Sequence, residues 1–170
     1  MIRFLGAALL VAGCGGLGLS AANRLDCRVR DLRELSAGLE ILQRELSWRL
    51  APLPEALEAA AGGTHGRAAQ FFAFCARESK RLAGAPFRTL WSRGLERSPL
   101  RLSREDRVLL EQLGPVLGRY DGDSQRQAVE NVLTGLGRQQ AQAEDDRRRL
   151  GRVYGVLGLT AGVFLALVLI

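Results

Sequence analysis

The sequence predicts an all-α protein, with a bundle of about six helices between two terminal transmembrane helices. Three observations support this fold class. Residues 4–22 and 153–170 contain no charged side chain. Between these runs, apolar residues recur at intervals of three and four, which is the period of a helix with one buried face. No sustained alternation of apolar and polar residues occurs there, and β-branched residues are scarce.

Each apolar end is long enough to cross a bilayer. At about 1.5 Å of rise per helical residue, either run covers roughly 27–28 Å, close to the hydrocarbon thickness of a membrane. Of the 24 Lys and Arg residues only Arg3 lies outside residues 24–152, and all 18 Asp and Glu residues lie inside that range. We therefore expect transmembrane helices over 4–22 and 153–170, with one soluble helical domain over 24–152.

The positions of the arginines predict the orientation of the chain. Basic residues follow the first apolar run and precede the second: Arg24, Arg28, Arg30, Arg33, Arg147, Arg148, Arg149 and Arg152. The positive-inside rule then places the domain in the cytoplasm and both termini across the membrane. Anionic lipid headgroups are the expected partners of these flanking arginines.

The first apolar run also has two processing alternatives. The sequence Val-Ala-Gly-Cys at 11–14 resembles a bacterial lipobox, which predicts an exported lipoprotein or envelope-binding module lipidated at Cys14. Ser20 and Ala22 are small residues that suit cleavage of a signal peptide. Against both, residues 15–22 stay apolar and arginines follow them at once. An uncleaved span is favoured, and the alternatives stay open.

The helices of the domain are indicated by apolar periodicity and by breakers. The first carries a leucine stripe, and it ends near Leu50 because Pro52 and Pro54 cannot continue it. Pro54 suits the first turn of the next helix, and Glu55 suits its positive end. The stripe consists of Leu32, Leu35, Leu39, Leu42 and Leu46.

Four further helices are expected after Gly62-Gly63. Thr64 can cap the third, over 65–82, and Pro86 begins the fourth. A capping arrangement of Ser103 with Asp106 begins the fifth. The last helix begins within 121–124 and, having no breaker, continues into the second span.

The second span contains a stripe of small residues. Gly151, Gly155, Gly158 and Gly162 are spaced by four, three and four positions, so they share one helical face. Small residues at this spacing allow helices to approach closely in lipid. We expect the two spans to pack on each other or on neighbouring subunits.

The sequence contains no pattern typical of an enzyme. Its single histidine, His65, and the cysteines Cys14, Cys27 and Cys75 have no metal-ligand or CxxC spacing. It has no phosphate-binding loop, no GxGxxG and no supported nucleophile–histidine pair. Acidic residues are interspersed with the arginines, which argues against nucleic acid. We expect no catalytic residue, metal, cofactor or small-molecule substrate.

Three segments together resemble a known family: ILQRELSWRLAPLPEALEAAA at 41–61, DRVLLEQLGPVLGRYDGDSQRQAV at 106–129 and RRRLGRVYGVLGLTAGVFLALVLI at 147–170. With the N-terminal span they resemble, from end to end, the stage III sporulation protein AB family of endospore-forming bacteria. The most specific part is Pro-Leu-Pro-Glu-Ala-Leu at 52–57. Departures are Cys14 in the first span and Asp-Gly-Asp at 121–123.

The resemblance implies a non-enzymatic component of the mother-cell membrane, in a channel-like complex with the forespore that endospore formation requires. Its soluble part would be similar to the six-helix cytoplasmic domain of type II secretion F platform proteins. Such platforms lie beside an assembly ATPase, so the expected partners are the ATPase stage III sporulation protein AA and other stage III proteins. The residues expected at two corners, for partner contact or for the fold, are Pro52, Pro54, Glu55, Gly114, Gly118, Asp121 and Gln125.

Overall fold

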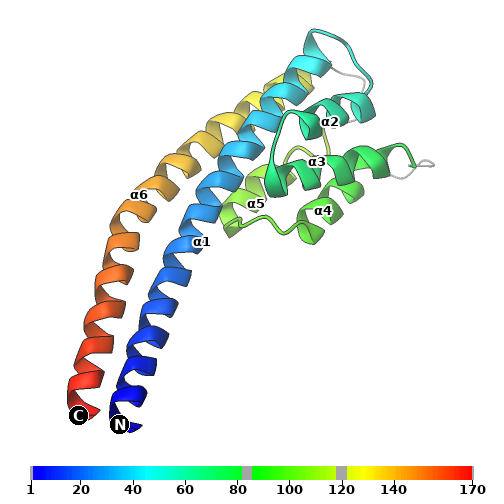
Figure 1. Cartoon of the computed structure of the whole chain (residues 1–170). Coiled ribbons are helices and arrows are strands. Elements are labelled where there is room, and N and C mark those ends of the chain that lie inside the picture. Colours follow the sequence, from blue (N-terminus) through cyan, green and yellow to red (C-terminus); the bar gives the residue numbers. More distant parts are fainter. Residues whose placement is uncertain (1, 82–85, 118–121, 170) are drawn as a thin grey trace. The chain divides into compact units, whose positions relative to one another are not determined.

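The described part of the chain is entirely helical in its regular structure, as predicted. The computed structural model describes residues 2–81, 86–117 and 122–169, without the side chains of 2–19, 21–22, 150–159 and 161–169. Within these residues there are six α-helices and no strand (Figure 1). The helices are α1 (Ile2–Ser47), α2 (Leu53–Gly62), α3 (Gly66–Ser79), α4 (Phe87–Arg97), α5 (Arg104–Glu111) and α6 (Gly122–Leu169).

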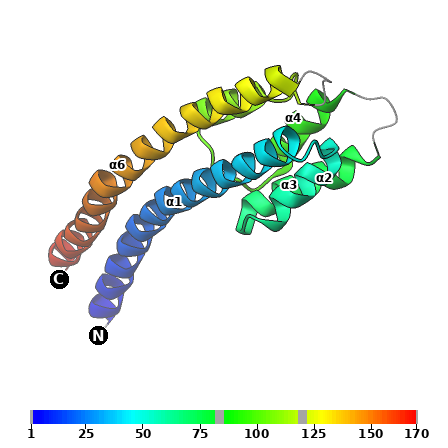
Figure 2. The same cartoon turned by 90° about the horizontal axis from the view of Figure 1, so that it is seen from above.

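The chain divides into two compact units. One unit is Arg30–Gln140, which contains α2 to α5 together with parts of α1 and α6. In this unit α1 and α6 lie side by side in both views (Figure 2), and Gln43 Nε2 donates to Glu130 Oε1 at 3.3 Å. The other unit consists of Met1–Val29 and Ala141–Ile170. Its two helical segments are joined by an ion pair between Arg147 and Asp26.

The two expected membrane spans are helical in backbone, but nearly all of their side chains lie outside the described residues. The same holds for Gly151, Gly155, Gly158 and Gly162. No helix within the described residues contains a stretch long and apolar enough to cross a membrane. The spans and their glycine packing therefore stay predictions.

Both terminal helices are longer than an ordinary soluble helix. The expected continuation of the last helix is confirmed, because α6 runs without a break over 48 residues. The N-terminal helix behaves in the same way, since α1 is one helix of 46 residues. Between Ala22 and Ser47 the sequence has no proline and only one glycine, Gly38, and tertiary packing can compensate for one glycine.

The leucine stripe of α1 forms the centre of the core. Leu32, Leu35, Leu39 and Leu42 have no exposed surface, as the helical period predicted. Gly38 lies on the same side and is also buried. A Cβ atom at this position would lie 2.1 Å from Cε2 of Phe72 on α3. The absence of a side chain at Gly38 therefore allows α3 to approach α1 closely.

An aromatic cluster joins α3, α4 and the end of α5. The ring of Phe71 lies edge-on to those of Phe72 and Trp91, with centroid distances of 5.2 and 4.8 Å. The buried Trp91 Nε1 donates to the carbonyl oxygen of Leu110 at 2.8 Å. This bond satisfies the one polar atom of the indole ring, so the whole side chain is buried without leaving an unpaired donor.

A buried carboxylate links three parts of the 30–140 unit. Asp31 on α1 is 5% exposed. Its Oδ1 accepts from Arg67 Nε on α3 at 3.0 Å, and its Oδ2 accepts from the backbone N–H of Arg101 at 2.7 Å. The partners are 36 and 70 residues away in sequence, so no local pattern predicted this contact.

One predicted helix cap is confirmed and another is wrong. Ser103 and Asp106 form a reciprocal capping box at α5, with distances of 2.7 and 3.2 Å. At α3 the N-cap residue is His65 and not Thr64. Thr64 Oγ1 instead donates to the carbonyl oxygen of Ala60 at 2.8 Å, which satisfies the end of α2. The backbone N–H of His65 donates to the carboxylate of Glu34 at 2.8 Å.

Candidate functional site at the α1–α2 corner

The turn after α1 exposes two large apolar side chains. Trp48 is 86% exposed and Leu50 is 82% exposed. Leu50 has a φ of +48°, in the left-handed region that residues with a side chain seldom adopt. We refer to Trp48 and Leu50 as the corner pair. These two side chains bury little surface in the core, and the backbone of Leu50 is strained. Exposed apolar residues and local strain are both typical of functional surfaces, so this turn is a candidate site.

Hydrogen bonds to Glu45 stabilise the turn. Its carbonyl oxygen accepts the backbone N–H of Ala51 at 3.1 Å. Its carboxylate, on a residue only 8% exposed, accepts from Arg49 Nη1 at 3.1 Å. These bonds fix the course of the chain between α1 and α2. The corner pair is consequently displayed by a defined turn.

A hollow of about 510 Å³ lies beside the corner pair. Its wall combines the apolar side chains of the corner with Asp123 and Arg126, two exposed residues of opposite charge on the first turns of α6. An aromatic anchor with a polar rim is the usual composition of an energetically important protein contact. The lining residues are Leu46, Ser47, Trp48, Leu50, Gly122, Asp123 and Arg126.

The residues predicted for the first corner lie next to this surface. Pro52 is exposed and serves as the N-cap residue of α2. Pro54 is half-buried in the first turn of α2, and Glu55 is exposed there. The three residues are near the corner pair in sequence, although none of them lines the hollow. Their role in partner contact stays a prediction.

The residues predicted for the later corner are placed differently. Gly114 is buried against α4, where a Cβ would lie 3.3 Å from the Cα of Arg88 and 3.4 Å from Cδ1 of Trp91. This position indicates helix packing. Gln125 is half-buried on α6. Gly118 and Asp121 lie outside the described residues.

Sequence reasoning missed the corner pair, Asp123 and Arg126 as surface residues. A weak signal was present, because a tryptophan and a leucine stand just before two prolines, beyond the end of the leucine stripe. Periodicity alone cannot show that no other helix covers them. The left-handed φ of Leu50 also has no sequence signal, since glycine or asparagine usually occupies such a position.

The described residues offer little that suggests covalent chemistry. They contain no group of three His, Cys, Asp or Glu side chains that could hold a metal ion. Burial raises the pKa of the Cys75 thiol to about 12, so this cysteine stays protonated and unreactive near neutral pH. His65 is exposed at the start of α3. The corner pair and its hollow are suited to binding another protein.

The described helices define an all-α domain with an exposed apolar surface at its α1–α2 corner. Residues 3–170 match the family described as Stage III sporulation protein AB. The chain belongs to this family, as the quoted segments predicted.

Two known proteins illustrate this relationship. The chain is 29% identical over 172 residues to Stage III sporulation protein AB of Bacillus subtilis (strain 168), which covers 99% of both chains. It is also similar to a solved structure of Stage III sporulation protein AB (SpoIIIAB), with a TM-score of 0.66 and 26% identity. That similarity covers 72% of this chain and 98% of the solved one. The chain therefore has a sporulation-related role.

Proposed function

We propose that this protein is a non-enzymatic platform component of the channel complex between mother cell and forespore. The observation that carries the proposal is the family match over residues 3–170. The helical bundle supports it, because a rigid all-α domain can present a defined surface to other proteins. Deleting the gene in the native organism should strongly reduce heat-resistant spores, and the intact gene should restore them. An unchanged spore count after deletion would contradict the proposal.

In this proposal residues 4–22 and 153–170 anchor the chain in the mother-cell membrane, and 24–152 form a cytoplasmic domain. The charge-free composition of both runs and the helical backbone of α1 and α6 support it. Protease treatment of sealed mother-cell vesicles with the cytoplasmic face outward should digest the domain and leave both spans protected. Protection of the domain instead would indicate the opposite orientation.

The lipoprotein alternative can be separated by one measurement. Mass spectrometry of the intact, membrane-extracted protein should find an uncleaved N-terminus that includes residues 1–13. A protein that begins at a lipidated Cys14 would support the envelope lipoprotein and overturn the platform topology. Cleavage after Ala22 would remove the first anchor.

We further propose that the corner pair contacts the expected ATPase partner, stage III sporulation protein AA. Exposed tryptophans are common among the residues that dominate protein–protein binding. Trp48→Ala should weaken binding of the purified ATPase by about tenfold or more, since such anchors contribute about 2 kcal/mol or more. Val108→Ala is the matched control, because Val108 is also an exposed apolar residue, at 53%. Equal binding by both variants would show that the corner pair is not part of the interface.

A further inference from the structure

The positive charge of the domain is concentrated in one stretch of sequence. Residues 24–152 hold 23 basic and 18 acidic residues, a net charge of +5. Residues 77–107 alone hold nine basic and four acidic residues, which is also a net +5. The remaining residues of 24–152 carry 14 of each sign and are neutral overall. The excess charge therefore lies on the end of α3, on α4 and on the start of α5.

Most of the basic side chains in this stretch form no ion pair within the described residues of the 30–140 unit. In the described part of the chain, six arginines of this stretch are exposed and have no side-chain ion pair within 4.0 Å. Other basic residues nearby are paired, such as Arg67 with Asp31 and Lys80 with Glu58. The six are Arg77, Arg88, Arg93, Arg97, Arg101 and Arg104.

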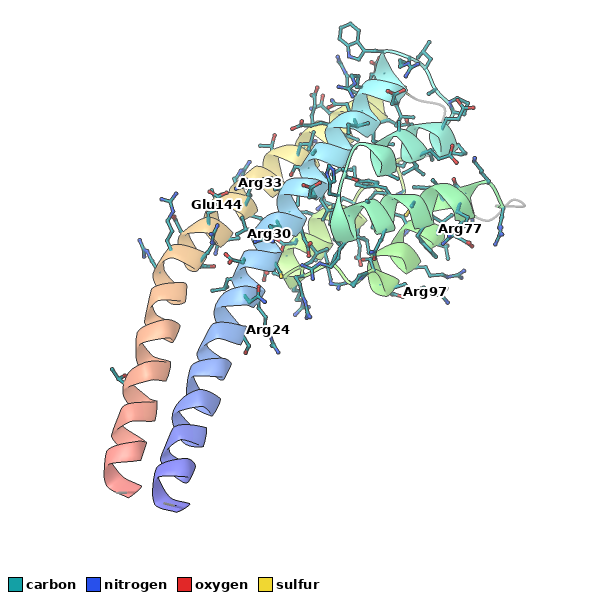
Figure 3. The ribbon with its side chains drawn as sticks, in the orientation of Figure 1. Arg24, Arg30, Arg33, Arg77, Arg97 and Glu144 are labelled. Atoms are coloured by element: carbon teal, nitrogen blue, oxygen red, sulfur yellow. The ribbon has the colours of Figure 1, made fainter. Side chains whose placement is uncertain are left out.

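A groove of about 220 Å³ between α3 and α4 lies within this basic surface. Phe71 and Phe74 provide apolar walls. Arg77 on α3 and Arg97 on α4 (Figure 3) contribute charged lining. Gly94 lines the same groove. A Cβ there would lie 3.0 Å from Sγ of the buried Cys75, 3.1 Å from Cε2 of Phe71 and 3.3 Å from Cδ1 of Phe74, so the absence of a side chain allows α4 to approach α3 closely.

We propose that the α3–α4 groove binds an acidic segment of a partner protein. One apolar side chain of that segment enters the groove against Phe71 and Phe74. Carboxylates on either side of it pair with Arg77 and Arg97, because guanidinium groups bind carboxylates in a bidentate manner. This site is separate from the corner pair, and its occupancy does not depend on the ATPase contact proposed above.

The combination of charge and an apolar groove selects the class of partner. A lipid surface or a nucleic acid backbone would be satisfied by the arginines alone and would leave the groove unexplained. Arg77 and Arg97 do occupy the last turns of α3 and α4, where a cation interacts favourably with the helix dipole. That effect accounts for one arginine in each helix. It does not account for the other unpaired arginines or for the groove between them.

Photo-crosslinking in living cells identifies the occupant directly. Gln70 is an exposed residue that lines the groove. It is replaced by a photoreactive amino acid in the full-length chain, which is expressed in sporulating cells. The crosslinked peptide is then sequenced by mass spectrometry. We expect a protein segment with net negative charge and an apolar residue at the crosslink. Crosslinks to lipid or nucleic acid only, to a segment without negative charge, or to nothing at all would overturn the proposal.

Charge reversal tests whether the arginines hold that segment. Arg77→Glu combined with Arg97→Glu should reduce the crosslink yield by about tenfold or more, because each change replaces attraction by repulsion. Arg138→Glu is the matched control, since Arg138 is an exposed arginine on α6 outside the basic stretch. Equal yields from the two variants would refute the role of the pair.

Two further measurements separate binding from folding. Arg77→Gln with Arg97→Gln removes the charge without repulsion, and it should lower the yield by a smaller factor. All variants should show the circular dichroism spectrum and unfolding midpoint of the wild type, because both side chains are exposed. Replacing the acidic residues of the crosslinked segment by lysine should restore the yield with the Arg→Glu pair. Failure of that restoration, in folded variants, would contradict direct pairing.

Discussion

The core leucines of α1 and the single leucine of the turn that follows it, Leu50, have opposite environments. Leu35, Leu39 and Leu42 have no exposed surface, whereas Leu50 is 82% exposed. Leu46 lies between them in sequence and is half-buried. The side chains are chemically identical, so the difference comes from their surroundings. Helix α3 packs against the stripe side of α1, with Phe72 beside Gly38, while the corner pair lies beside a hollow.

This contrast separates the residues that fold the domain from those available for binding. The core leucines stabilise the folded state because nearly all of their apolar surface is removed from water. The corner pair contributes almost none, and Leu50 is held in an unfavourable backbone conformation. Substitutions in the core should therefore change the free energy of unfolding. Substitutions in the corner should instead change partner binding.

The largest expected difference is between two leucine-to-alanine variants. Leu39→Ala should lower the free energy of unfolding of the full chain by about 2–5 kcal/mol, because it leaves a cavity in the core. Leu50→Ala should change it by less than about 0.5 kcal/mol, as for most exposed positions. Chemical denaturation of the purified variants measures both values. Similar losses in the two variants would show that the corner is part of the core.

Gly38→Ala tests the close contact of α1 with α3. Alanine favours a helix over glycine by about 1 kcal/mol, but its Cβ would meet the buried ring of Phe72. We expect a net loss of about 1–3 kcal/mol in the free energy of unfolding. Gly137→Ala is the control, because a Cβ at Gly137 meets nothing within 4 Å and should be neutral or stabilising. A stabilising effect at both positions would mean that α3 can move away without cost.

Loss of the capping box should have a smaller effect. Ser103→Ala removes the side-chain acceptor for the backbone N–H of Asp106. The expected loss is about 1 kcal/mol in the free energy of unfolding. Thr64→Ala provides a comparison, since Thr64 bonds to the end of α2 and does not cap α3. Hydrogen exchange should show faster opening of the first turn of α5 only in the Ser103 variant.

Leu50→Gly should stabilise the fold while it weakens binding. Glycine adopts the left-handed region without strain, which favours the variant by up to about 1 kcal/mol in the free energy of unfolding. Removal of an exposed apolar side chain should reduce affinity for the partner at the corner. Denaturation and a binding assay on the same sample separate the two effects. A variant that binds as well as the wild type would indicate that Trp48 acts alone.

The last comparison is between two cysteines that differ in burial and should therefore differ in reactivity. Cys75 is buried and the pKa of its thiol is raised to about 12, while Cys27 is partly exposed. Because the thiolate is the reactive form, iodoacetamide at pH 8 should modify Cys27 and leave Cys75 unmodified in the folded protein. Peptide mass spectrometry after short reaction times gives the result. Rapid modification of Cys75 would mean that the α3–α4 region opens easily.

Much of the fold follows from local sequence. The leucine stripe, the two prolines at 52 and 54 and the Ser103–Asp106 capping box each specify an element or its end from residues within a few positions. The corner pair could not be predicted in this way. Whether Trp48 is buried depends on which helices pass over it, and that information is distributed over distant parts of the chain.

The sequence by itself determined the helical class, the apolar ends, the buried face of α1 and the family. These properties depend on residue type and on spacing along one helix, which a sequence states directly. Only the tertiary structure decided that Gly38 admits Phe72, that Asp31 joins Arg67 to the backbone of residue 101, and that the corner pair stays uncovered. Such features arise when helices separated by tens of residues pack together, and no local period encodes that packing.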